Sequence, residues 1–376
     1  MANIIKGITT DIGGSGIRSM GIGELVSEHS NTVKIIDEET FRVKESSEKQ
    51  EELFEIVSST NADYVGIYAM GYTGELYSGV VANMTSQGTK TQSKVYYIQS
   101  LYAIAYELLE YYLDDLIEER LINLDTDTFD VIMTTCIPVR EHTGNTDGAT
   151  LLKQKLAGEY SIKFPTVNNG VTINFKIKEE NIAVLPEGAS IVPTLGGVES
   201  DDITLVVDLG YVTMDLALFR GKQLLGDNVV SSPNAGSTLE GLIRNILIDA
   251  GFSRASNEVA RHALETGKVK VGGTDKDISH IVKKTKEAFV QNFIKSEIVN
   301  IVNTANLALT DINNIVPIGG PMQEDDKTGS IPDMILDYCG LEDATMFVQE
   351  GNLRHVNIIK AHSIMKVLLK RAGVEF

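Results

Sequence analysis

The chain of 376 residues contains no tryptophan, only two cysteines and only eight prolines. Cys136 and Cys339 cannot build a disulfide framework, and neither has metal-ligand spacing or a neighbouring pair of histidines, which argues against a zinc site. Basic side chains are also scarce: the chain contains 33 of them and 52 acidic ones, so its net charge is −19. This excess of negative charge disfavours direct binding to DNA or to an anionic membrane.

Long apolar runs are missing as well, because no stretch approaches the ~20 apolar residues that a membrane span needs. The chain begins almost at once with a predicted strand, Ile4–Thr10, which leaves no room for a signal peptide. We therefore expect a cytoplasmic protein with no membrane partner. The composition, 43% hydrophobic and 23% charged, is ordinary for a soluble globular chain, and the length suffices for two domains with separate cores.

Two stretches, residues 9–16 and 206–215, repeat one pattern about 200 residues apart. Each consists of a strand, an aspartate, a glycine-containing turn and more strand, which is typical of a β-hairpin with an exposed tip. Glycine lets a polyphosphate approach the backbone N–H groups, and a carboxylate at the turn can hold Mg²⁺. Two copies spaced by one domain length predict two related halves that face one phosphate chain.

The first turn contains Asp11, Gly13, Gly14, Ser15 and Gly16. We expect its backbone N–H groups and the Ser15 hydroxyl to bind phosphate oxygens, and Asp11 to hold Mg²⁺ through the water shell of the ion. Taken alone, these residues fit an ordinary glycine turn with a surface aspartate equally well.

The second turn makes the functional interpretation stronger. Asp208 is placed like Asp11, Gly210 permits the turn, and Thr213 offers a hydroxyl group. We expect Asp208 to hold Mg²⁺ through water as well. Asp215, on the returning strand, fits a functional role and a structural carboxylate bonded to turn amides equally well.

Glu187 is the candidate for orienting the attacking water in the hydrolysis of a terminal phosphate. It follows Pro186 at the end of a predicted strand, where the stiff backbone can aim a carboxylate. Hydrolysis of this kind needs little beyond an oriented water and charge neutralisation by Mg²⁺. A Pro-Glu pair is more often part of a loop, so the interest of Glu187 comes from its place in the order of elements.

Two further glycine sites follow predicted strands or precede a predicted helix. Gly319, Gly320 and Pro321 follow an apolar strand and would let a purine ring or ribose lie flat against the backbone, or they form a simple turn. Gly236 and Ser237 open a predicted helix and could place amides near the nucleotide. Ser237 also fits a helix N-cap.

The clearest helical period covers Val95–Leu121, and further helices are predicted over Ser237–Ala250, Ile278–Leu309 and Val356–Lys370. The tyrosines of the first of these helices lack interleaved basic residues, so we expect packing rather than base stacking. A hairpin turn at residues 168–170 should join strands at 161–167 and 171–177.

Taken in order, these segments resemble the actin-type ATPase superfamily, which also contains sugar kinases and heat-shock chaperone ATPases. Thr9–Gly16 and Val206–Asp215 resemble its two phosphate loops, and Ile315–Pro321 is similar to its adenosine motif. Phe129–Pro138 and Asn352–Lys366 resemble its connecting segments. Val184–Glu187 is similar to the Pro-Glu site of plasmid-segregating actins of the ParM and Alp type, whose glutamate serves ATP hydrolysis.

The resemblance implies an α/β, two-domain actin-like fold, a duplicated ribonuclease H-like architecture with an interdomain nucleotide cleft. Residues 1–200 and 350–376 would form domain I, and residues 201–349 domain II. The implied ligands are ATP or GTP with Mg²⁺. The implied activity is nucleotide-dependent assembly into dynamic filaments that hydrolysis destabilises. A ParR-like DNA-binding adaptor would connect the filaments to plasmid DNA, without direct nucleic-acid contact.

Tyr211 and Val212 stand where many relatives have small residues, so we expect side chains to crowd the second turn. A small-molecule kinase of the same fold is the main alternative function, but it would need a further catalytic aspartate for its acceptor, and no such motif is found. A nucleotide-dependent chaperone module would need a separate substrate-binding domain, for which 376 residues leave no space.

Overall fold

The computed structural model of the chain describes residues 3–374 apart from 15, 22, 24, 40, 43–49, 83–88, 118–126, 144–146, 169, 253–254, 324–326 and 350. The chain divides into two compact units. Unit 1 contains residues 1–137, 141–186 and 357–376, and unit 2 contains residues 138–140 and 187–356. These divisions differ from the boundaries expected from the sequence, because residues 187–200 and 350–356 pack with unit 2.

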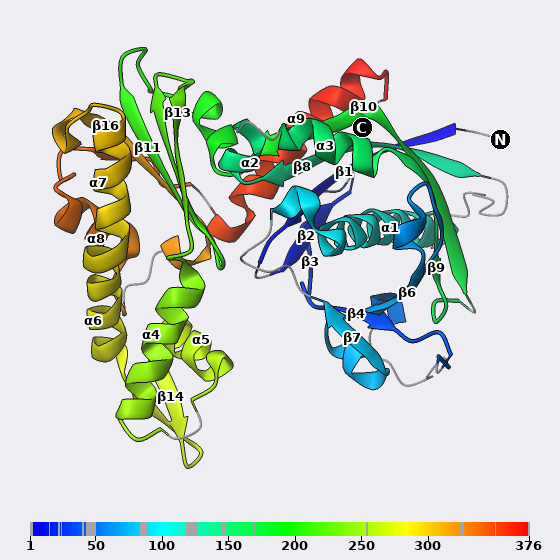
Figure 1. Cartoon of the computed structure of the whole chain (residues 1–376), viewed down its shortest axis with the longest axis horizontal. Coiled ribbons are helices and arrows are strands. Elements are labelled where there is room, and N and C mark those ends of the chain that lie inside the picture. Colours follow the sequence, from blue (N-terminus) through cyan, green and yellow to red (C-terminus); the bar gives the residue numbers. More distant parts are fainter. Residues whose placement is uncertain are drawn as a thin grey trace. The chain divides into compact units, whose positions relative to one another are not determined.

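Unit 1 is built on a sheet of ten strands in the order β3-β2-β1-β8-β10-β9-β5-β6-β4-β7 (Figure 1). The strands are β1 Asn3–Ile12, β2 Ile17–Met20, β3 Ser27–His29, β4 Val33–Ile36, β5 Leu53–Ser59, β6 Gly66–Met70, β7 Gly79–Ala82, β8 Thr128–Ile137, β9 Gly158–Phe164 and β10 Val171–Pro186. The predicted hairpin at residues 168–170 is confirmed, since β9 and β10 pair antiparallel from Phe164 opposite Val171. The backbone of Asn168 is left-handed there, with φ 45°.

Helices cover both faces of this sheet. They are α1 Lys94–Ile117, α3 Gly148–Leu156 and α9 Val356–Arg371, while the short α2, Val139–Thr143, crosses the division between the units. Successive side chains of a strand point to opposite faces, so Val131 and Met133 of β8 join the core that contains α1, whereas Ile132 joins the cluster that contains α9.

The tyrosines of α1 are packing residues, as the sequence predicts. Tyr96, Tyr97 and Tyr102 are at most 1% exposed and lie in the core of unit 1. Burial raises the pKa of Tyr102 well above its ordinary value, and nearby acidic groups such as Glu52 raise it further. The phenol of Tyr102 therefore stays neutral at any physiological pH, and all three buried rings are out of reach of a nucleobase.

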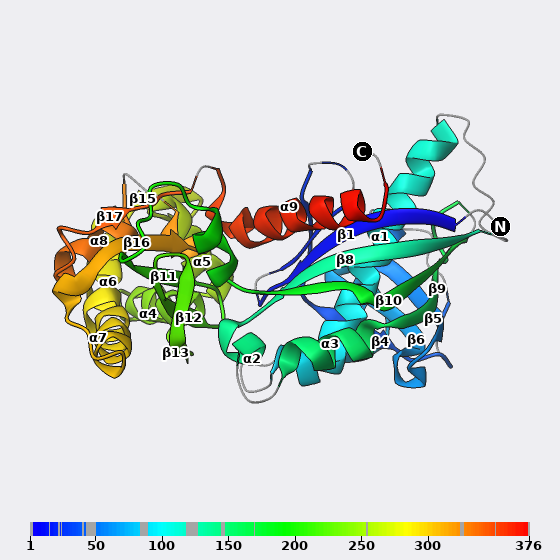
Figure 2. The same cartoon turned by 90° about the horizontal axis from the view of Figure 1, so that it is seen from above.

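α9 lies along β1 and β8 on the other face of the sheet (Figure 2). Gly7 of β1 makes the close approach possible, because a Cβ atom at that position would stand 2.1 Å from the sulfur of Met365. Behind it, Thr9, Thr134 and His362 form a buried polar contact, with Thr9 Oγ1 2.9 Å from Thr134 Oγ1 and 3.3 Å from His362 Nδ1.

Unit 2 contains a five-stranded sheet in the order β13-β12-β11-β16-β17 and a separate two-stranded sheet. The strands are β11 Ile203–Leu209, β12 Met214–Arg220, β13 Gln223–Ser232, β14 Lys268–Val271, β15 Thr274–Asp277, β16 Ile312–Ile318 and β17 Thr345–Met346. The helices are α4 Gly236–Asp249, α5 Asn257–Thr266, α6 Ser279–Phe289, α7 Lys295–Thr304 and α8 Ile331–Cys339.

The long helix predicted over Ile278–Leu309 is present as α6 and α7, joined by a π-helical turn at Val290–Ile294. It ends at Thr304, earlier than predicted, because Asn306 adopts the left-handed conformation with φ 55° and Leu307 N donates to Val302 O. The segment between α4 and α6, for which no element was predicted from the sequence, contains α5 and the hairpin of β14 and β15. α5 begins at an N-cap, Ser256, whose side chain accepts a bond from Val259 N.

The repeat seen in the sequence is also a repeat of topology. In unit 1, β1 pairs antiparallel with β2 and parallel with β8, and in unit 2, β11 pairs antiparallel with β12 and parallel with β16. The neighbours extend the match, since the order β3-β2-β1-β8-β10 corresponds to β13-β12-β11-β16-β17. Each glycine-rich turn therefore joins the first two strands of its own sheet.

Candidate functional site

The second glycine turn connects β11 and β12 in unit 2. Gly210 N donates to Thr213 O at 3.0 Å and closes the turn. Asp208 and Asp215 are direct partners in the antiparallel pairing, and both are nearly buried, at 7% and 6% exposure. Directly opposite side chains lie on the same face of a sheet, where two like charges repel one another. The turn thus holds two adjacent carboxylates that a cation would stabilise.

Thr213 forms a hydrogen bond with one of these two carboxylates. Its hydroxyl donates to Asp215 Oδ2 at 3.0 Å. The bond orients the Asp215 carboxylate through a hydroxyl group and not through the turn amides considered from the sequence. The hydrogen bond does not remove the negative charge of the Asp215 carboxylate.

Glu187 and Gly188 lie beside the second turn. Gly188 has φ +67°, and a Cβ atom there would stand 3.2 Å from both Cβ and Oδ2 of Asp208. Only glycine combines this backbone conformation with such a close approach. Glu187, the residue before it, is 8% exposed. The structure therefore brings the predicted hydrolytic glutamate next to the predicted magnesium-binding aspartate.

The N-terminus of α4 packs directly on the second turn. Gly236 N donates to Gly210 O at 3.0 Å, and Ser237 N donates to Tyr211 O at 2.8 Å. These two amides are therefore engaged with the protein backbone, in contrast to the amide role expected for them from the sequence. The N-cap interpretation of Ser237 is wrong: the N-cap is Ala235, and Ser237 is an exposed residue inside the helix.

These hydrogen bonds also orient the peptide groups of the turn. In a trans peptide the C=O and N–H bonds point in opposite directions. Because the carbonyls of Gly210 and Tyr211 point at α4, the N–H groups of Tyr211 and Val212 point away from it. Two successive amides directed to one side of a turn form a concave anion-binding arrangement.

Gly319, Gly320 and Pro321 surround the same turn from β16. Gly319 has φ +100°, and a Cβ atom there would stand 2.1 Å from Leu209 O. A Cβ atom at Gly236 would meet Gly210 O at 3.1 Å and Pro321 Cγ at 3.2 Å. The second turn, the α4 N-terminus and the glycine pair after β16 thus lie close together within unit 2.

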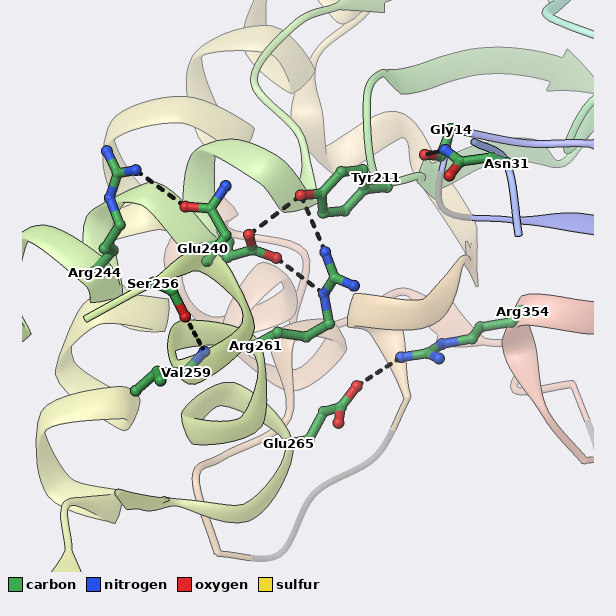
Figure 3. A network of polar contacts seen from close by, with 11 residues as sticks. Gly14, Asn31, Tyr211, Glu240, Arg244, Ser256, Val259, Arg261, Glu265 and Arg354 are labelled. Carbon is green, nitrogen blue, oxygen red and sulfur yellow. Dashed lines mark hydrogen bonds and ion pairs between the residues drawn. The ribbon is translucent and has the colours of Figure 1, made fainter. Parts of the chain in front are cut away.

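Tyr211 does not crowd the turn, contrary to the expectation from its size. Its ring turns toward α4 and α5, where its hydroxyl donates to Glu240 Oε1 at 3.2 Å (Figure 3). Arg261 of α5 bonds both of them, with Nε donating to Glu240 Oε2 at 3.1 Å and Nη2 to Tyr211 Oη at 3.2 Å. The guanidinium also lies over the ring, 5.1 Å from its centroid. Glu240, only 2% exposed, is thereby satisfied.

A second pair of charged residues flanks the glycines after β16. Arg354 packs against Gly320, where a Cβ atom would stand 2.7 Å from its Nε. Its Nη2 donates to Glu265 Oε1 of α5 at 3.1 Å, and both side chains are about half exposed (Figure 3). Arg261, Glu265 and Arg354 were not identified from the sequence. One pattern in the sequence could have identified the first two of these residues. Ser256 and Gly267 are typical helix caps, and a helix between them places Arg261 and Glu265 one turn apart on α5.

The first glycine turn connects β1 and β2 in unit 1. Gly13 N donates to Gly16 O at 3.0 Å, and Asn31 Nδ2 donates to Gly14 O. Asn31 is held in turn by Gln99 of α1, whose Nε2 donates to Asn31 O at 2.6 Å. Ser15 lies outside the described residues.

Asp11 of the first turn is an ion-pair partner. Arg18 faces it across the hairpin, and Arg18 Nη1 donates to Asp11 Oδ2 at 3.2 Å. Both side chains are at most 10% exposed, and Arg18 Nε lies 3.4 Å from Glu28 Oε1. Arg18 was not identified from the sequence, although its position opposite Asp11 follows from a tight hairpin.

The residues present fit a magnesium ion that keeps most of its water. Within the described ranges, no group of three or more His, Cys, Asp or Glu side chains is arranged to hold a metal ion. Mg²⁺ in nucleotide sites is commonly bound by one or two carboxylates plus phosphate oxygens and water, so a full protein cage is not required. The Asp208–Asp215 pair supplies hard oxygen ligands of the right charge.

No family model matches the chain, and no curated protein matches it. Solved structures do. Alp7A, an actin-like protein, is 16% identical and has a TM-score of 0.69, with 99% of each chain covered. A 15-stranded ParM filament from Clostridium botulinum is 14% identical, with a TM-score of 0.59, 97% of this chain and 100% of that one covered. A Bacillus thuringiensis ParM hybrid with ADP, which contains two ParM mutants, is 12% identical with a TM-score of 0.60, and the match covers 99% of this chain and 49% of the hybrid.

The chain therefore has the α/β, two-domain fold of actin-like proteins. Within that class, its structural neighbours are of the ParM and Alp type, as the sequence predicts. No helix within the described residues has both the length and the apolar character needed to cross a membrane.

Proposed function

We propose that this protein binds ATP or GTP together with Mg²⁺, assembles into filaments in a nucleotide-dependent manner, and hydrolyses the nucleotide. One observation carries the proposal. A pair of adjacent buried carboxylates, Asp208 and Asp215, lies at a glycine turn whose amides point outward, with Glu187 beside it. The combination supplies the cation ligands, anion donors and water-orienting carboxylate that phosphoanhydride hydrolysis needs.

Each residue has a distinct proposed role. The N–H groups of Tyr211 and Val212 would donate to phosphate oxygens, and Thr213 keeps the Asp215 carboxylate oriented. Asp208 and Asp215 would hold Mg²⁺ through its water shell. When bound, the ion would neutralise the negative charge that develops on the phosphates. Glu187 would orient the attacking water and accept its proton.

The nucleoside would lie against Gly319, Gly320 and Pro321. Glycine at the first two positions exposes the backbone, and Arg354 beside Gly320 offers a planar cation that can stack on a base. Gly236 supports this site by allowing α4 to approach both the turn and Pro321. The Ser237 hydroxyl is exposed at the start of α4 and is available for the ribose or phosphate.

In the first turn, Gly13, Gly14, Ser15, Gly16 and Asp11 keep their predicted phosphate- and magnesium-binding roles as part of the proposal. Arg18 adds a cation beside Asp11 that favours a bound anion. Nucleotide affinity of the single variants Arg18→Ala and Thr213→Ala tests whether both turns act on one nucleotide, since a loss of affinity in only one of them would contradict it.

Assembly and DNA segregation are the broader part of the proposal. The fold match to a ParM filament supports self-assembly as the property to test first. Movement of plasmid DNA would require a ParR-like adaptor, because the net charge of −19 opposes direct DNA contact.

Light scattering and phosphate release after addition of Mg²⁺ with ATP or GTP test the proposal. We expect scattering that depends on nucleotide and on protein concentration, followed by phosphate release. Hydrolysis without scattering would instead favour a phosphotransferase of the same fold, and the absence of both would refute the proposed function.

Glu187→Ala tests the catalytic assignment. We expect phosphate release to slow about 100-fold while nucleotide affinity stays within about threefold, as for loss of a general base. Glu199→Ala removes an exposed acidic residue of the same unit and is the matched control. Unchanged turnover in Glu187→Ala would remove Glu187 from the mechanism.

A further inference from the structure

The C-terminal helix α9 has a charge opposite to that of the rest of the molecule. Its sixteen residues include Lys360, Lys366, Lys370 and Arg371 and no acidic residue. These four positive charges belong to a chain of net charge −19, so the rest of the chain carries −23. A helix of this composition on an acidic protein is a distinct electrostatic feature.

The basic residues of α9 gather on its solvent-facing side. Ile358, Ala361, Met365 and Leu369 are fully buried at the helical spacing that faces the sheet. On the other side, Ile359, Ser363 and Val367 follow one another at intervals of four residues and are exposed, the two aliphatic side chains by 43% and 49%. Lys370 and Arg371 are exposed beside them. We name Ile359, Lys360, Ser363, Lys366, Val367, Lys370 and Arg371 the α9 face.

We propose that the α9 face binds an acidic surface on a second copy of this chain, as a contact between subunits of the assembly. This inference rests on the proposed self-assembly and adds the surface that mediates it. The face combines branched aliphatic side chains with surrounding positive charge, which is the composition of a small apolar contact with a polar rim. The complementary negative charge is provided by the remainder of every other copy.

Charge also determines the symmetry of this contact. A face that carries four positive charges and no negative ones repels an identical face, so it cannot form a two-fold symmetric contact with itself. It must therefore meet a different, acidic surface of the neighbour. A contact between two different surfaces is heterologous and, unless the rotation closes a ring, it repeats into an open filament.

Two other occupants fit the observations less well. An amphipathic helix that binds a membrane inserts its apolar side, but here Met365 and Leu369 pack on Gly7 and Ile132 of the sheet. The DNA backbone would offer phosphates to the basic side chains but no apolar partner for the exposed side chains of Ile359 and Val367.

The contact is tested with Lys360→Glu combined with Lys370→Glu in the full chain. Lys222→Glu combined with Lys284→Glu makes the same change in charge at exposed positions of unit 2 and is the matched control. We expect the critical concentration for nucleotide-dependent sedimentation to rise at least about tenfold for the α9 variant and less than about twofold for the control. Assembly of the α9 variant at the concentration of the control would overturn the proposal.

Nucleotide affinity, measured with a fluorescent analogue below the critical concentration, separates this inference from the proposed function. We expect both variants to bind nucleotide as the unmodified protein does, which also shows that they are folded. Added salt should narrow the difference in critical concentration between the α9 variant and the control, because charge pairs at the rim of a contact are screened while the net charge of the two variants is the same.

Zero-length carbodiimide cross-linking of a mixture of ¹⁴N- and ¹⁵N-labelled protein reads the contact directly. We expect amide links between Lys360 or Lys370 of one copy and a carboxylate of the other. This readout remains decisive if the protein fails to form filaments: mixed-isotope links at these lysines would still support the contact, and their absence would refute it. Binding of phosphatidylserine vesicles or a DNA duplex that is lost in the α9 variant, with unchanged self-association, would likewise overturn it.

Discussion

The two glycine turns share a sequence pattern but differ in the residue that faces the aspartate. In the first turn Asp11 faces Arg18, and the two form an ion pair. In the second turn Asp208 faces Asp215. The same hairpin geometry thus holds a neutralised carboxylate in unit 1 and two adjacent carboxylates in unit 2.

This difference suits the facing pair of the first turn to stabilise the fold and that of the second turn to bind a cation. An opposite-charge pair across a hairpin stabilises the strands, whereas like charges in directly opposite positions repel one another. We therefore infer that the second turn provides the dominant cation site, and that the first turn is stable without a ligand. Four predictions test this comparison.

The largest effect is expected at the second turn. Asp208→Asn should lower Mg²⁺-dependent phosphate release about 100-fold or more, the equivalent of about 3 kcal/mol of transition-state stabilisation. Asp11→Asn should cost less than about tenfold, because Arg18 already neutralises that carboxylate. Steady-state phosphate release across a Mg²⁺ titration measures both. Equal losses would show that the two aspartates contribute alike and would contradict the comparison.

The stability of the first turn should depend on its ion pair. Arg18→Leu leaves Asp11 buried beside no cation on the facing strand, and we expect the free energy of unfolding to fall by about 2 kcal/mol. Asp215→Asn removes a like charge from the second turn and should leave stability unchanged or raise it in the absence of metal ions. Urea denaturation in EDTA gives both values. A larger loss of stability for Asp215→Asn than for Arg18→Leu would show that the second turn, and not the first, depends on its facing side chains for stability.

Gly188→Ala probes the contact between Glu187–Gly188 and Asp208. The backbone of Gly188 is left-handed, so the substitution should cost about 1 kcal/mol of folding stability from backbone strain. Gly197→Ala is the matched control, because Gly197 has a similar φ of +77° and no atom within 4 Å of its added Cβ. We expect similar losses of stability, with slower phosphate release only in Gly188→Ala. Slower phosphate release in both variants would show that backbone strain, and not the contact with Asp208, causes the effect.

The smallest effect concerns Glu107 of α1, which accepts a bond from Ser19 of β2 at 2.6 Å. Burial raises the pKa of Glu107, although bonds from Ser19 and Ser27 oppose the shift. A raised pKa favours the folded state at low pH, and this contribution is lost as the pH rises through the folded-state value. Glu107→Gln should therefore gain stability relative to the unmodified protein between pH 4 and pH 8. Thermal unfolding across that range measures it, and a difference independent of pH would refute the prediction.

Much of the architecture could be predicted from the sequence where local patterns are strong. The repeated strand–aspartate–glycine pattern identified both hairpins, and the apolar period identified α1, the α6–α7 helix and α9. α5 and α8 were missed because their apolar periods are short. Their caps were nevertheless visible, with Ser256 and Gly267 around α5 and Ser330 and Gly340 around α8.

The residues of the candidate site were harder to predict from the sequence than the architecture was. Glu187, Asp208 and the glycines after β16 are adjacent to recognisable turns, so the sequence alone singled them out. The N-cap interpretation of Ser237 failed because its amide is bonded to the carbonyl of Tyr211, a residue 26 positions earlier in the chain. A tertiary contact of this kind leaves no local pattern, and the same is true of Arg354 against Gly320.

The two hairpin turns, with the residues that face each other across them, and the main helices follow from residues close together in the chain, and the acidic character follows from the composition. Packing between distant segments brings other groups together: Gly188 with Asp208, Arg354 with Gly320, and Tyr211 with Arg261. Strand register and helix packing bring these residues together, and both are set by the burial of side chains far apart in sequence. Which side chains surround the second glycine turn is therefore a property of the fold.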